Sequence, residues 1–264
     1  MFSNLANLLR YRGLIASLVA RELKARYRGS MFGFFWSFIN PLLLLLIYSF
    51  VFTSIIPNED AKTRPYALFM FCGILPWTWF ATSLSDAAGS LIAGGNLIKK
   101  VLFPAEVLPI VNVLANMVHF FLGLTILIVF LVVYQKMPDP WDLVWFPIAV
   151  IVQLVFTTAL GLALAALAVH FRDIRDILAN LLTLWFFATP IIYPYFQPNV
   201  QKFRPLFNVN PFTHLAISYQ EILFFQGPIG HWKWLLGLGA ASIPLFLGCY
   251  WMFDRLRDSF AEAV

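Results

Sequence analysis

Charged side chains are scarce in this sequence. Asp, Glu, Lys and Arg make up 12% of its 264 residues, whereas hydrophobic residues make up 61%. Soluble proteins average about a quarter charged residues, so this chain could not cover its apolar surface in water. The shortage of charge excludes a soluble domain and predicts an integral membrane protein. The net charge of +5 is expected to orient the chain and to meet anionic membrane lipids, and no nucleic-acid partner is expected.

Motifs that bind nucleotides or metals are also missing. A phosphate-binding loop needs G-x-x-x-x-G-K-[ST], and the string GGNLIKK at residues 94–100 has the wrong spacing. The sequence has no H-E-x-x-H string and no paired-cysteine pattern. Acids are nearly absent from the long apolar runs, where proton-coupled transport would need them. We therefore expect no enzyme activity, metal or cofactor on this chain, and an energy source on another polypeptide.

Six stretches are long and apolar enough to cross a membrane, since a spanning helix needs about 20 mostly apolar residues. They cover residues 33–56, 67–92, 107–133, 143–169, 177–196 and 231–253. Pro190 and Pro194 interrupt the end of the fifth. The prediction is an all-α integral membrane protein with six transmembrane helices in one domain over residues 1–264. Spans one to five occupy residues 33–196, and residues 254–264 form a cytoplasmic tail.

Lys and Arg residues are distributed unevenly among the segments that join these spans. Cytoplasmic loops of membrane proteins carry an excess of both. One set of segments holds Arg10, Arg12, Arg21, Lys24, Arg26, Arg28, Lys99, Lys100, Arg172, Arg175, Arg255 and Arg257. The opposite set holds only Lys62, Arg64, Lys136, Lys202, Arg204 and Lys233. The bias predicts that both termini lie in the cytoplasm.

The segment before the first span has helical periodicity but is not continuously apolar. Its apolar residues include Leu5, Leu8, Leu9, Leu14, Ile15, Leu18, Val19 and Leu23. The pattern predicts an amphipathic helix over 3–28, within a cytoplasmic interface segment of residues 1–30. The helix ends in four cations, Arg21, Lys24, Arg26 and Arg28. A simple topology anchor is the alternative, although an anchor needs few cations.

Residues 197–230, between spans five and six, are too apolar for a solvated loop and too often broken by proline to span a membrane. Proline suits a first helical turn, so Asn210-Pro211 predicts a short helix over 211–225. Re-entrant or interfacial helices on the extracytoplasmic side fit best. Irregular backbone at membrane depth is tolerated only against protein or a water-filled path.

Two cytoplasmic connections are expected to contact a partner. The first, GGNLIKKVLFPAEVLP at residues 94–109, predicts a short amphipathic helix. Its candidate contact residues are Asn96, Leu97, Ile98, Lys99, Lys100 and Phe103. The second, HFRDIRD at residues 170–176, includes Arg172 and Asp173 in a turn of alternating charge. Hydrophobic residues on a cytosolic loop favour a partner surface, and ordinary topogenic charge is the alternative for both connections.

Aromatic residues make up 17% of the chain, and some of them recur on one side of the first span. Four fall within a sector of about 80° on a helix: Phe34, Phe38, Tyr48 and Phe52. Trp36 and Phe50 point elsewhere. With Tyr193 and Tyr195, the four are candidates to offer flat apolar faces to sugar rings along a channel. Lipid-facing side chains and interfacial aromatic belts are the alternative.

Several strings resemble landmarks of one family, in the family's order. R-E-L-K-x-R-Y-R-x-S-x-x-G-x-x-W spans Arg21 to Trp36, and NLIKKVLFPAEVLP, FRDIRDI, TPIIYP and NPFTHL follow. They resemble the type-2 ABC exporter permeases for cell-surface polysaccharides, and the similarity covers essentially the whole chain. The O-antigen type is the most similar group, and the teichoic-acid and capsule exporters are its relatives.

The resemblance implies a homodimer in the bacterial inner membrane, bound to two copies of a separate ATPase that carries the ATP and Mg. The implied substrate is an undecaprenyl-pyrophosphate-linked polysaccharide. Residues 95–103 would be the coupling helix that docks on the ATPase, and 197–228 the extracytoplasmic gate. The pyrophosphate would enter beside Arg21, Lys24, Arg26 and Arg28. Gln220 and Glu221 stand where relatives often carry an Arg, so the lining of the gate departs from the family pattern.

Two other classes of protein remain as alternatives. One is a type-2 permease that exports a small lipid or a drug, and a long hydrated path lined by aromatic rings would argue against it. The other is a membrane enzyme that acts on lipid-linked glycans, and no constellation of acid, base or nucleophile supports it. An ATPase gene beside this one would favour the exporter.

Overall fold

The computed structural model describes residues 10–55, 61–99, 103–171, 173–225 and 227–263. In these ranges the chain is helical and has no strand, which confirms the all-α prediction. The helices are α2 (Arg12–Arg26), α3 (Trp36–Phe50), α4 (Tyr66–Ala93), α5 (Gly95–Ile98), α6 (Val107–Val133), α7 (Trp145–His170), α8 (Ile174–Phe187), α9 (Pro198–Gln201), α10 (Arg204–Val209), α11 (Pro211–Leu223) and α12 (Trp232–Ala263). The shorter turns are η1 (Gly33–Phe35), η2 (Val51–Ile55), η3 (Ala61–Thr63) and η4 (Asp142–Val144).

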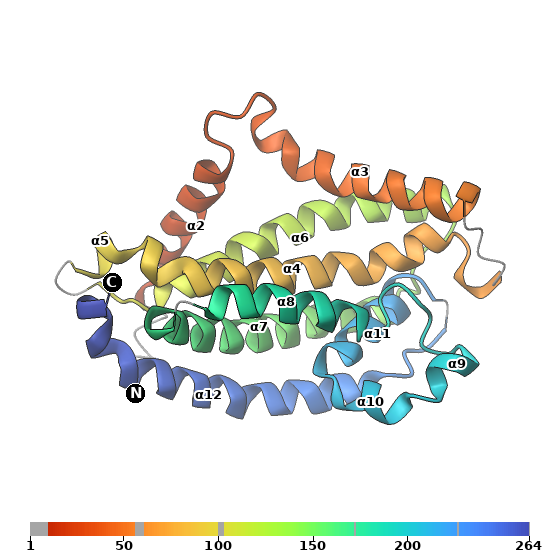
Figure 1. Cartoon of the computed structure of the whole chain (residues 1–264). Coiled ribbons are helices and arrows are strands. Elements are labelled where there is room, and N and C mark those ends of the chain that lie inside the picture. Colours follow the sequence, from red (N-terminus) through yellow and green to blue (C-terminus); the bar gives the residue numbers. More distant parts are fainter. Residues whose placement is uncertain (1–9, 56–60, 100–102, 172, 226, 264) are drawn as a thin grey trace.

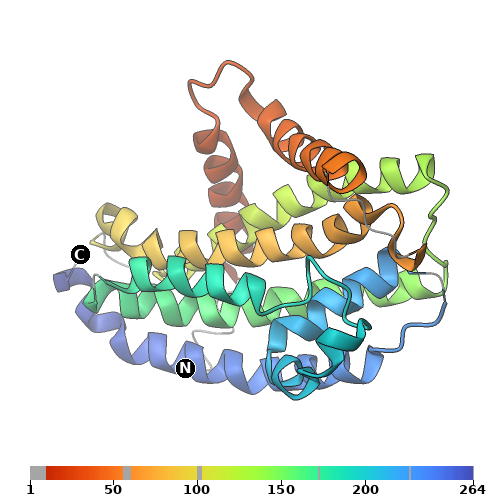
Figure 2. The same ribbon diagram turned by 45° about the vertical axis from the view of Figure 1, so that its right-hand side comes forward.

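The long helices lie side by side, with α4 in the middle of the bundle (Figure 1). α4 packs against α6, α7, α8 and α11, and α12 packs along α7. α2 and α3 form a hairpin on one side of the bundle and both contact α6. Figure 2 shows that α5 and the C-terminus lie at one end, and that α9, α10 and α11 lie at the other. In the predicted orientation the first of these ends is cytoplasmic.

The core is built around α4, because both its apolar and its polar groups find partners on neighbouring helices. Trp79 is buried and its Nε1 donates a hydrogen bond to the carbonyl of Val113 at 3.1 Å. Gln153 on α7 donates from Nε2 to the carbonyl of Pro76 at 2.8 Å. A Cβ built on Gly161 would lie 3.3 Å from the Cβ of Ala87, so a small residue is what lets α7 approach α4 closely.

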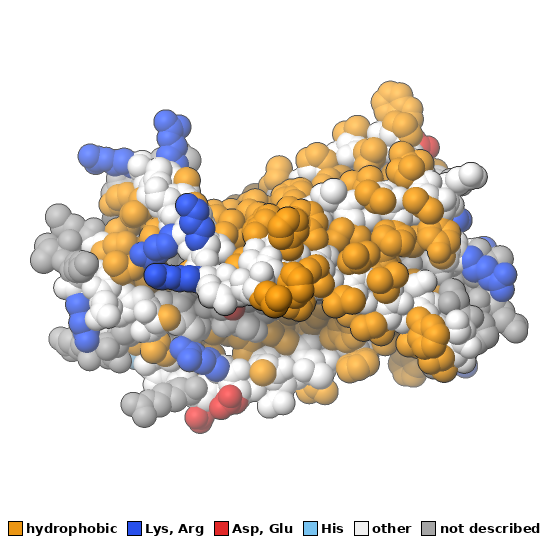
Figure 3. Space-filling model, turned by 90° about the horizontal axis from the view of Figure 1, so that it is seen from above, with side chains coloured by type: hydrophobic (Ala, Val, Ile, Leu, Met, Phe, Trp, Pro, Cys, Tyr) orange, Lys and Arg blue, Asp and Glu red, His pale blue; other side chains and the backbone are white. Residues whose placement is uncertain are grey.

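Five helical segments in the described ranges are long and apolar enough to cross a membrane. They are Gly33–Phe50, Tyr66–Ala93, Val107–Val133, Asp142–His170 and Trp232–Phe260. They correspond to the first, second, third, fourth and sixth predicted spans. In Figure 3, hydrophobic side chains cover the middle of the face that carries α3, while Lys and Arg gather at the end where α2 lies. This distribution suits a multi-pass membrane protein.

The fifth predicted span, 177–196, is not confirmed as a crossing. Its helix, α8, has 14 residues and ends at Phe187, which gives a length of about 21 Å. The hydrocarbon layer is about 30 Å thick. Turns and irregular backbone follow, with Pro190 and Pro194 inside them. Proline lacks the amide hydrogen of a continuing helix, so each of these positions would cost a helix extended through it one backbone hydrogen bond.

The predicted cytoplasmic tail, residues 254–264, is helical in its described part, and its cytoplasmic position remains a prediction. The chain continues as helix from the sixth span, and α12 runs without a break to Ala263. Phe253 is 1% exposed and Phe260 is 0% exposed. These two residues are seven apart, which places them on one face of a helix. Burial of that face explains why the segment continues as helix against the rest of the protein.

The N-terminal helix is described from Arg12 onward, and the predicted start at residue 3 lies outside the described residues. Leu18 is buried against Val107 and Val111 of α6. Leu14 and Val19 pack beside it, while Arg12 is exposed. The apolar side of α2 therefore packs on protein. A position at the membrane surface remains a prediction.

The predicted helix over 211–225 is present as α11, which ends two residues early. Asn210 caps it, since its Oδ1 accepts a hydrogen bond from the amide of Phe212 at 3.0 Å. The ring of Phe212 lies 4.9 Å from that of Trp77 and 4.7 Å from that of Phe80. α11 therefore reaches into the core beside the middle of α4.

Candidate functional site

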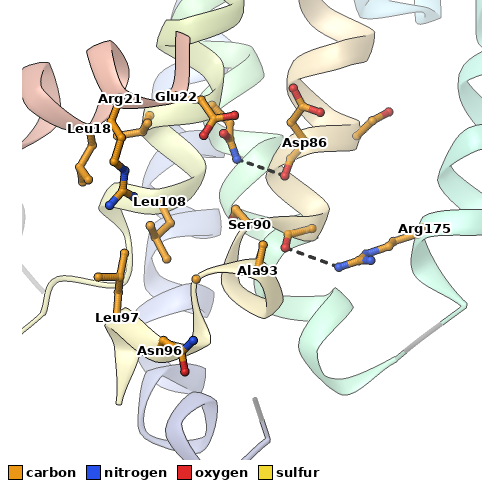
Figure 4. Close-up of a pocket in the computed structure, with 15 residues that line it drawn as sticks. Leu18, Arg21, Glu22, Asp86, Ser90, Ala93, Asn96, Leu97, Leu108 and Arg175 are labelled. Atoms are coloured by element: carbon orange, nitrogen blue, oxygen red, sulfur yellow. Dashed lines mark hydrogen bonds between the residues drawn. The ribbon is translucent and has the colours of Figure 1, made fainter. Parts of the chain in front are cut away.

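A pocket of about 620 Å³ lies between α2, α4, α5, α6 and α8, at the end of the bundle predicted to be cytoplasmic. Figure 4 shows Arg21 and Glu22 entering it from α2, with Arg175 on its other side. Polar side chains complete the lining between them, from Ser85, Asp86, Ser90, Asn96 and Asn112. Because the two guanidinium groups come from different helices, the pocket could hold an anion between them.

Arg175 is held against α4 by close approach to a glycine. Its Nη2 donates to the carbonyl of Gly89 at 3.5 Å. A Cβ at Gly89 would lie 3.3 Å from the same nitrogen. A larger residue there would push the guanidinium away from its place in the pocket. Arg175 was not among the predicted site residues. It belongs to the FRDIRD string of alternating charge, from which only Arg172 and Asp173 were predicted to make contacts.

Arg26 is held in a closed polar triad. Its Nη2 forms an ion pair with Oδ2 of Asp86 at 2.8 Å, and its Nη1 donates to Oδ1 of Asn116 at 2.8 Å. Asn116 Nδ2 donates to the same Asp86 oxygen at 2.8 Å. The triad joins the end of α2 to α4 and α6. Arg26 was predicted as a site residue but neither of its partners was, although an acid or an amide such as Asn116 inside an apolar span is a recognised signal of function.

The four cations predicted to bind pyrophosphate therefore have different surroundings. Arg21 lines the pocket and Arg26 is paired with Asp86. Lys24 and Arg28 are exposed. The structure does not bring all four around one cavity, because Arg26 faces another side of α2. The role of the cluster in binding a pyrophosphate remains a prediction.

A polar chain continues from the triad along the α2–α3 hairpin. Ser37 Oγ donates to the hydroxyl of Tyr27 at 2.8 Å, and that hydroxyl lies 3.5 Å from Nδ1 of His119. These residues line a second pocket of about 460 Å³ together with Trp36 and Asn40 of α3. Trp36, predicted to point elsewhere, is thus the α3 aromatic beside a cavity.

The aromatic residues predicted for a sugar path form two separate clusters. Phe34 and Phe38 lie with Tyr27 at one end of α3. The ring of Phe34 is 6.1 Å from that of Tyr27 and 6.0 Å from that of Phe38. Phe52, at the other end, lies 6.4 Å from Tyr48. None of Phe34, Phe38, Tyr48 and Phe52 lines the pocket beside Trp36.

The two remaining channel candidates, Tyr193 and Tyr195, lie at the same end of the molecule as Phe52, since the ring of Phe52 lies 5.0 Å from that of Tyr66, whose hydroxyl donates to the carbonyl of Ile192. The hydroxyl of Tyr193 donates to the carbonyl of Phe187 at 2.7 Å, and that of Tyr195 to Oδ1 of Asn208 at 3.1 Å. Both hydroxyls therefore hold the outer segment together. Their contribution to a sugar path remains a prediction.

The predicted ATPase contacts in the described ranges lie at the end of the bundle predicted to be cytoplasmic, and three of them pack against other parts of the chain. Leu97, Ile98 and Phe103 are partly buried against a local apolar core. Asn96, Lys99 and Asp173 are exposed. Residues 95–98 form α5, and Gly94 is its N-cap residue. Lys100 and Arg172 lie outside the described residues.

The outer end carries a stack of aromatic and imidazole rings. His214 lies flat on Trp234 at 4.5 Å, and its Nδ1 is 3.2 Å from Nε2 of His231. Burial lowers the pKa of His214, although its contact with Asn208 opposes this. Burial, His214 and Arg204 lower the pKa of His231 to about 4. Both rings are therefore neutral near pH 7.

Gln220 and Glu221, which depart from the family pattern, both point toward backbone. Gln220 Nε2 donates to the carbonyl of Pro190 at 3.1 Å. Glu221 Oε2 accepts from the amide of His231 at 2.9 Å, at the start of α12. Burial raises the pKa of Glu221. The two side chains therefore join α11 to its neighbours.

In the described ranges, no group of three His, Cys, Asp or Glu residues forms a candidate metal site.

Comparison with known proteins gives consistent matches over most of the chain. Residues 13–224 match the family described as ABC-2 type transporter. The chain is 43% identical over 258 residues to the O-antigen export system permease protein RfbA of Myxococcus xanthus, with 97% of each chain covered. It is 33% identical over 253 residues to a protein of the same name from Klebsiella pneumoniae, with 94% covered. The capsule polysaccharide export inner-membrane protein CtrC of Neisseria meningitidis serogroup A is 27% identical over 174 residues, with 64% covered.

Proposed function

The chain belongs to the ABC-2 type transporter family, and from that premise we propose that it is the membrane subunit of an ATP-driven polysaccharide exporter. It moves a polysaccharide linked to a lipid pyrophosphate across the inner membrane. Two copies form the channel, and two separate ATPase subunits supply the energy. The similarity to proteins named as O-antigen permeases, over nearly their whole length, supports the substrate class.

The observation that carries the proposal is the pair of arginines across the cytoplasmic-end pocket. Arg21 and Arg175 enter from α2 and α8 with polar groups between them. A diphosphate has several oxygens for two planar guanidinium groups, which bind such groups through paired hydrogen bonds. Arg26 is paired with Asp86 and lines the second pocket instead. The first pocket thus offers two cations at once to a diphosphate.

The exposed side of α8 supports the two-copy channel. Ile177, Leu181 and Leu184 are all exposed on this helix, and so are the polar residues Asn180 and Thr183. α4 carries its own exposed polar stripe beside it, from Thr78, Thr82 and Ser85. Polar groups within a membrane helix normally face protein or a water-filled path. A second copy facing α8 would give both kinds of side chain a suitable neighbour, and the polar stripes would line a path for sugars.

The position of α11 supports an outer gate. α11 begins beside the middle of α4, where Phe212 contacts Trp77 and Phe80, and it ends near the start of α4, where the ring of Phe224 lies 5.7 Å from that of Phe69. That arrangement is what a re-entrant helix requires. α11 is joined to α12 by Glu221 and His231, so opening of the gate would move these two helices together.

The test compares two double variants of the chain in complex with its ATPase. Arg21→Gln with Arg175→Gln removes both pocket cations. Arg12→Gln with Arg28→Gln removes the same charge from exposed positions, the first on α2 and the second two residues beyond its end. Hydrogen bonds to charged groups contribute about 1.5–3 kcal/mol each. We expect the pocket variant to lower export and substrate-stimulated ATP hydrolysis by about tenfold or more.

The readouts are surface polysaccharide in cells that lack the native gene, and ATP hydrolysis in vesicles that contain lipid-linked polysaccharide. The Arg12 and Arg28 variant should remain near wild type in both. Normal export by the pocket variant would exclude the pocket as the pyrophosphate site. The proposal that this chain exports a polysaccharide would be excluded by either of two results. One is unchanged surface polysaccharide after deletion of the gene, and the other is ATP hydrolysis that a small lipid alone stimulates.

A further inference from the structure

The cytoplasmic end of the bundle has a hydrophobic core of its own, separate from the one around α4. Its fully buried members come from four elements and include Leu91, Leu162, Tyr250, Phe253 and Phe260. Leu97, Ile98 and Phe103 pack against it from the segment proposed to contact the ATPase. Figure 1 shows the C-terminus beside α5, and Figure 2 shows the same. The end of α12 and the proposed coupling segment therefore share one core.

A buried carboxylate lies in the same place. Glu106 follows Phe103 by three residues and immediately precedes α6, and its side chain is 3% exposed. Its Oε2 has no hydrogen-bond partner among the described residues. The nearest cation is Arg257 of α12, whose Nη2 lies 3.7 Å away. A buried carboxylate needs a paired charge to remain ionised, so Arg257 is the group that makes this position tolerable for an acid.

The last turns of α12 make further contacts at this end. Ser259 lies 3.0 Å from Nε2 of His170, the last residue of α7. The ring of Phe260 lies 6.3 Å from the same imidazole and 5.1 Å from Phe253. One helical segment thus holds the end of α7 through His170 and the start of α6 through Glu106.

We propose that the C-terminal turns of α12 are a brace that makes the coupling segment move as one body with the bundle, with Glu106 and Arg257 as its positioning residues. The inference rests on the proposed function, because it assigns the brace to an ATPase-driven exporter. When the ATPase displaces α5 and Phe103, the displacement is transmitted along the chain to Glu106, three residues after Phe103. While Arg257 is paired with Glu106, that displacement moves α6 and α12 together with the coupling segment. Without that pair, residues 103–106 shift relative to α6, and ATP is hydrolysed with less export.

The decisive variant is Glu106→Gln, because it removes the ion pair without leaving a buried charge. We expect near-normal amounts of the complex in the membrane and near-normal ATP hydrolysis. Export per ATP hydrolysed should fall about fivefold or more, the lower range of measured coupling between sites. Arg257→Gln should lose the same coupling and also some protein, since it leaves the carboxylate unpaired. Combining the two should be no worse than Glu106→Gln alone.

Arg255→Gln is the matched control. Arg255 is on the same helix, two residues away, exposed, and packed over the ring of Trp251 at 5.5 Å. This variant should keep wild-type export per ATP. Wild-type coupling in Glu106→Gln would overturn the brace, and so would a loss explained entirely by less complex in the membrane. A wild-type chain that binds no ATPase, or exports nothing with it, would instead contradict the proposed function itself.

Discussion

α3 and α4 are both long and apolar enough to cross a membrane, yet they have opposite surroundings. In the most apolar stretch of α4, 83% of the residues are buried within the chain. In the stretch that contains α3, Gly33–Phe50, the share is 11%. Length and hydropathy predict that a helix crosses a membrane, because both features meet the needs of the hydrocarbon layer. They do not predict its neighbours. α4 is enclosed by protein, whereas α3 leaves most of its surface for lipid or for another subunit.

The difference follows from side-chain shape and from small polar groups. α4 presents large rings to α6, α7 and α11, and close contacts at Ala87 and Gly89 bring helices near it. α3 packs on α4 and α6 by one narrow side, where Leu45 is buried, while Leu46 and Phe50 are exposed. A mutation in α4 should therefore affect folding, whereas a mutation on the exposed side of α3 should affect assembly or contact with lipid.

The largest expected effect is on the α4 core. Phe80 is 0% exposed, and its ring lies 4.7 Å from that of Phe212 and 5.3 Å from that of Trp185. Phe80→Ala should lower the free energy of unfolding by about 3–5 kcal/mol, since it removes a ring from a packed core. Thermal unfolding of the detergent-purified chain measures this.

Phe50→Ala is the matched change in α3, where the ring is 62% exposed. It should alter stability by about 0.5 kcal/mol or less. Equal losses in the two variants would break the comparison between the helices. They would mean that the exposed side of α3 is packed in the purified state, as it would be against a second copy.

Local features of the fold could be predicted from the sequence. Asn210-Pro211 predicted the start of α11, because its cap and its proline act within one turn. The apolar runs predicted the helices that cross. Pro190 predicted where the fifth run breaks, but a residue count could not show that only α8 would remain helical. The family resemblance, carried by strings from Arg21 onward, is confirmed by the match over residues 13–224.

Contacts between distant residues could not be predicted in this way. Arg26 meets Asp86 across 60 positions, and Glu106 meets Arg257 across a much longer separation. A charge near a span end looks the same in sequence whether it faces lipid, water or an opposite charge. The helical C-terminal turns could have been predicted locally, since Phe253 and Phe260 lie on one face of a helix. The charged residues between them favoured the prediction of a tail instead.

The second effect concerns the junction between α4 and the α2–α3 hairpin. Asp86→Ala should lower the free energy of unfolding by about 1–3 kcal/mol, because Arg26 and Asn116 both lose a partner. The side chains of Asp86 and Arg26 are 38% and 28% exposed, so solvent keeps the cost near the low end. Trypsin should also cleave near Arg26 faster, because α2 loses its attachment to α4.

Asp173→Ala is the control for that change, since Asp173 is exposed and its side chain caps no helix amide. It should leave both stability and cleavage near wild type. If Asp86→Ala behaved the same way, the triad would contribute nothing to the hairpin. The mobility of α2 would then depend on Leu18 and its neighbours alone.

The smallest effect concerns α11, which is buried like α4 although it contains polar residues. His231 has a pKa lowered from 6.5 to about 4 by burial, His214 and Arg204, and burial lowers that of His214 as well. A lowered histidine pKa means that the unfolded chain takes up protons first as pH falls. Stability from these rings is therefore fully present above pH 6.5 and is lost between pH 6.5 and about 4.

Glu221 opposes this in part. Burial raises its pKa above 4.5, so its protonation favours the folded chain in the lower part of the same window. We expect the midpoint of thermal unfolding to fall between pH 6.5 and 4, and to fall less in His231→Gln. Trp234→Phe keeps a ring under His214 and should retain the wild-type slope. If wild type and His231→Gln showed the same slope, the histidine stack would be open to water, and α11 would not share the enclosed surroundings of α4.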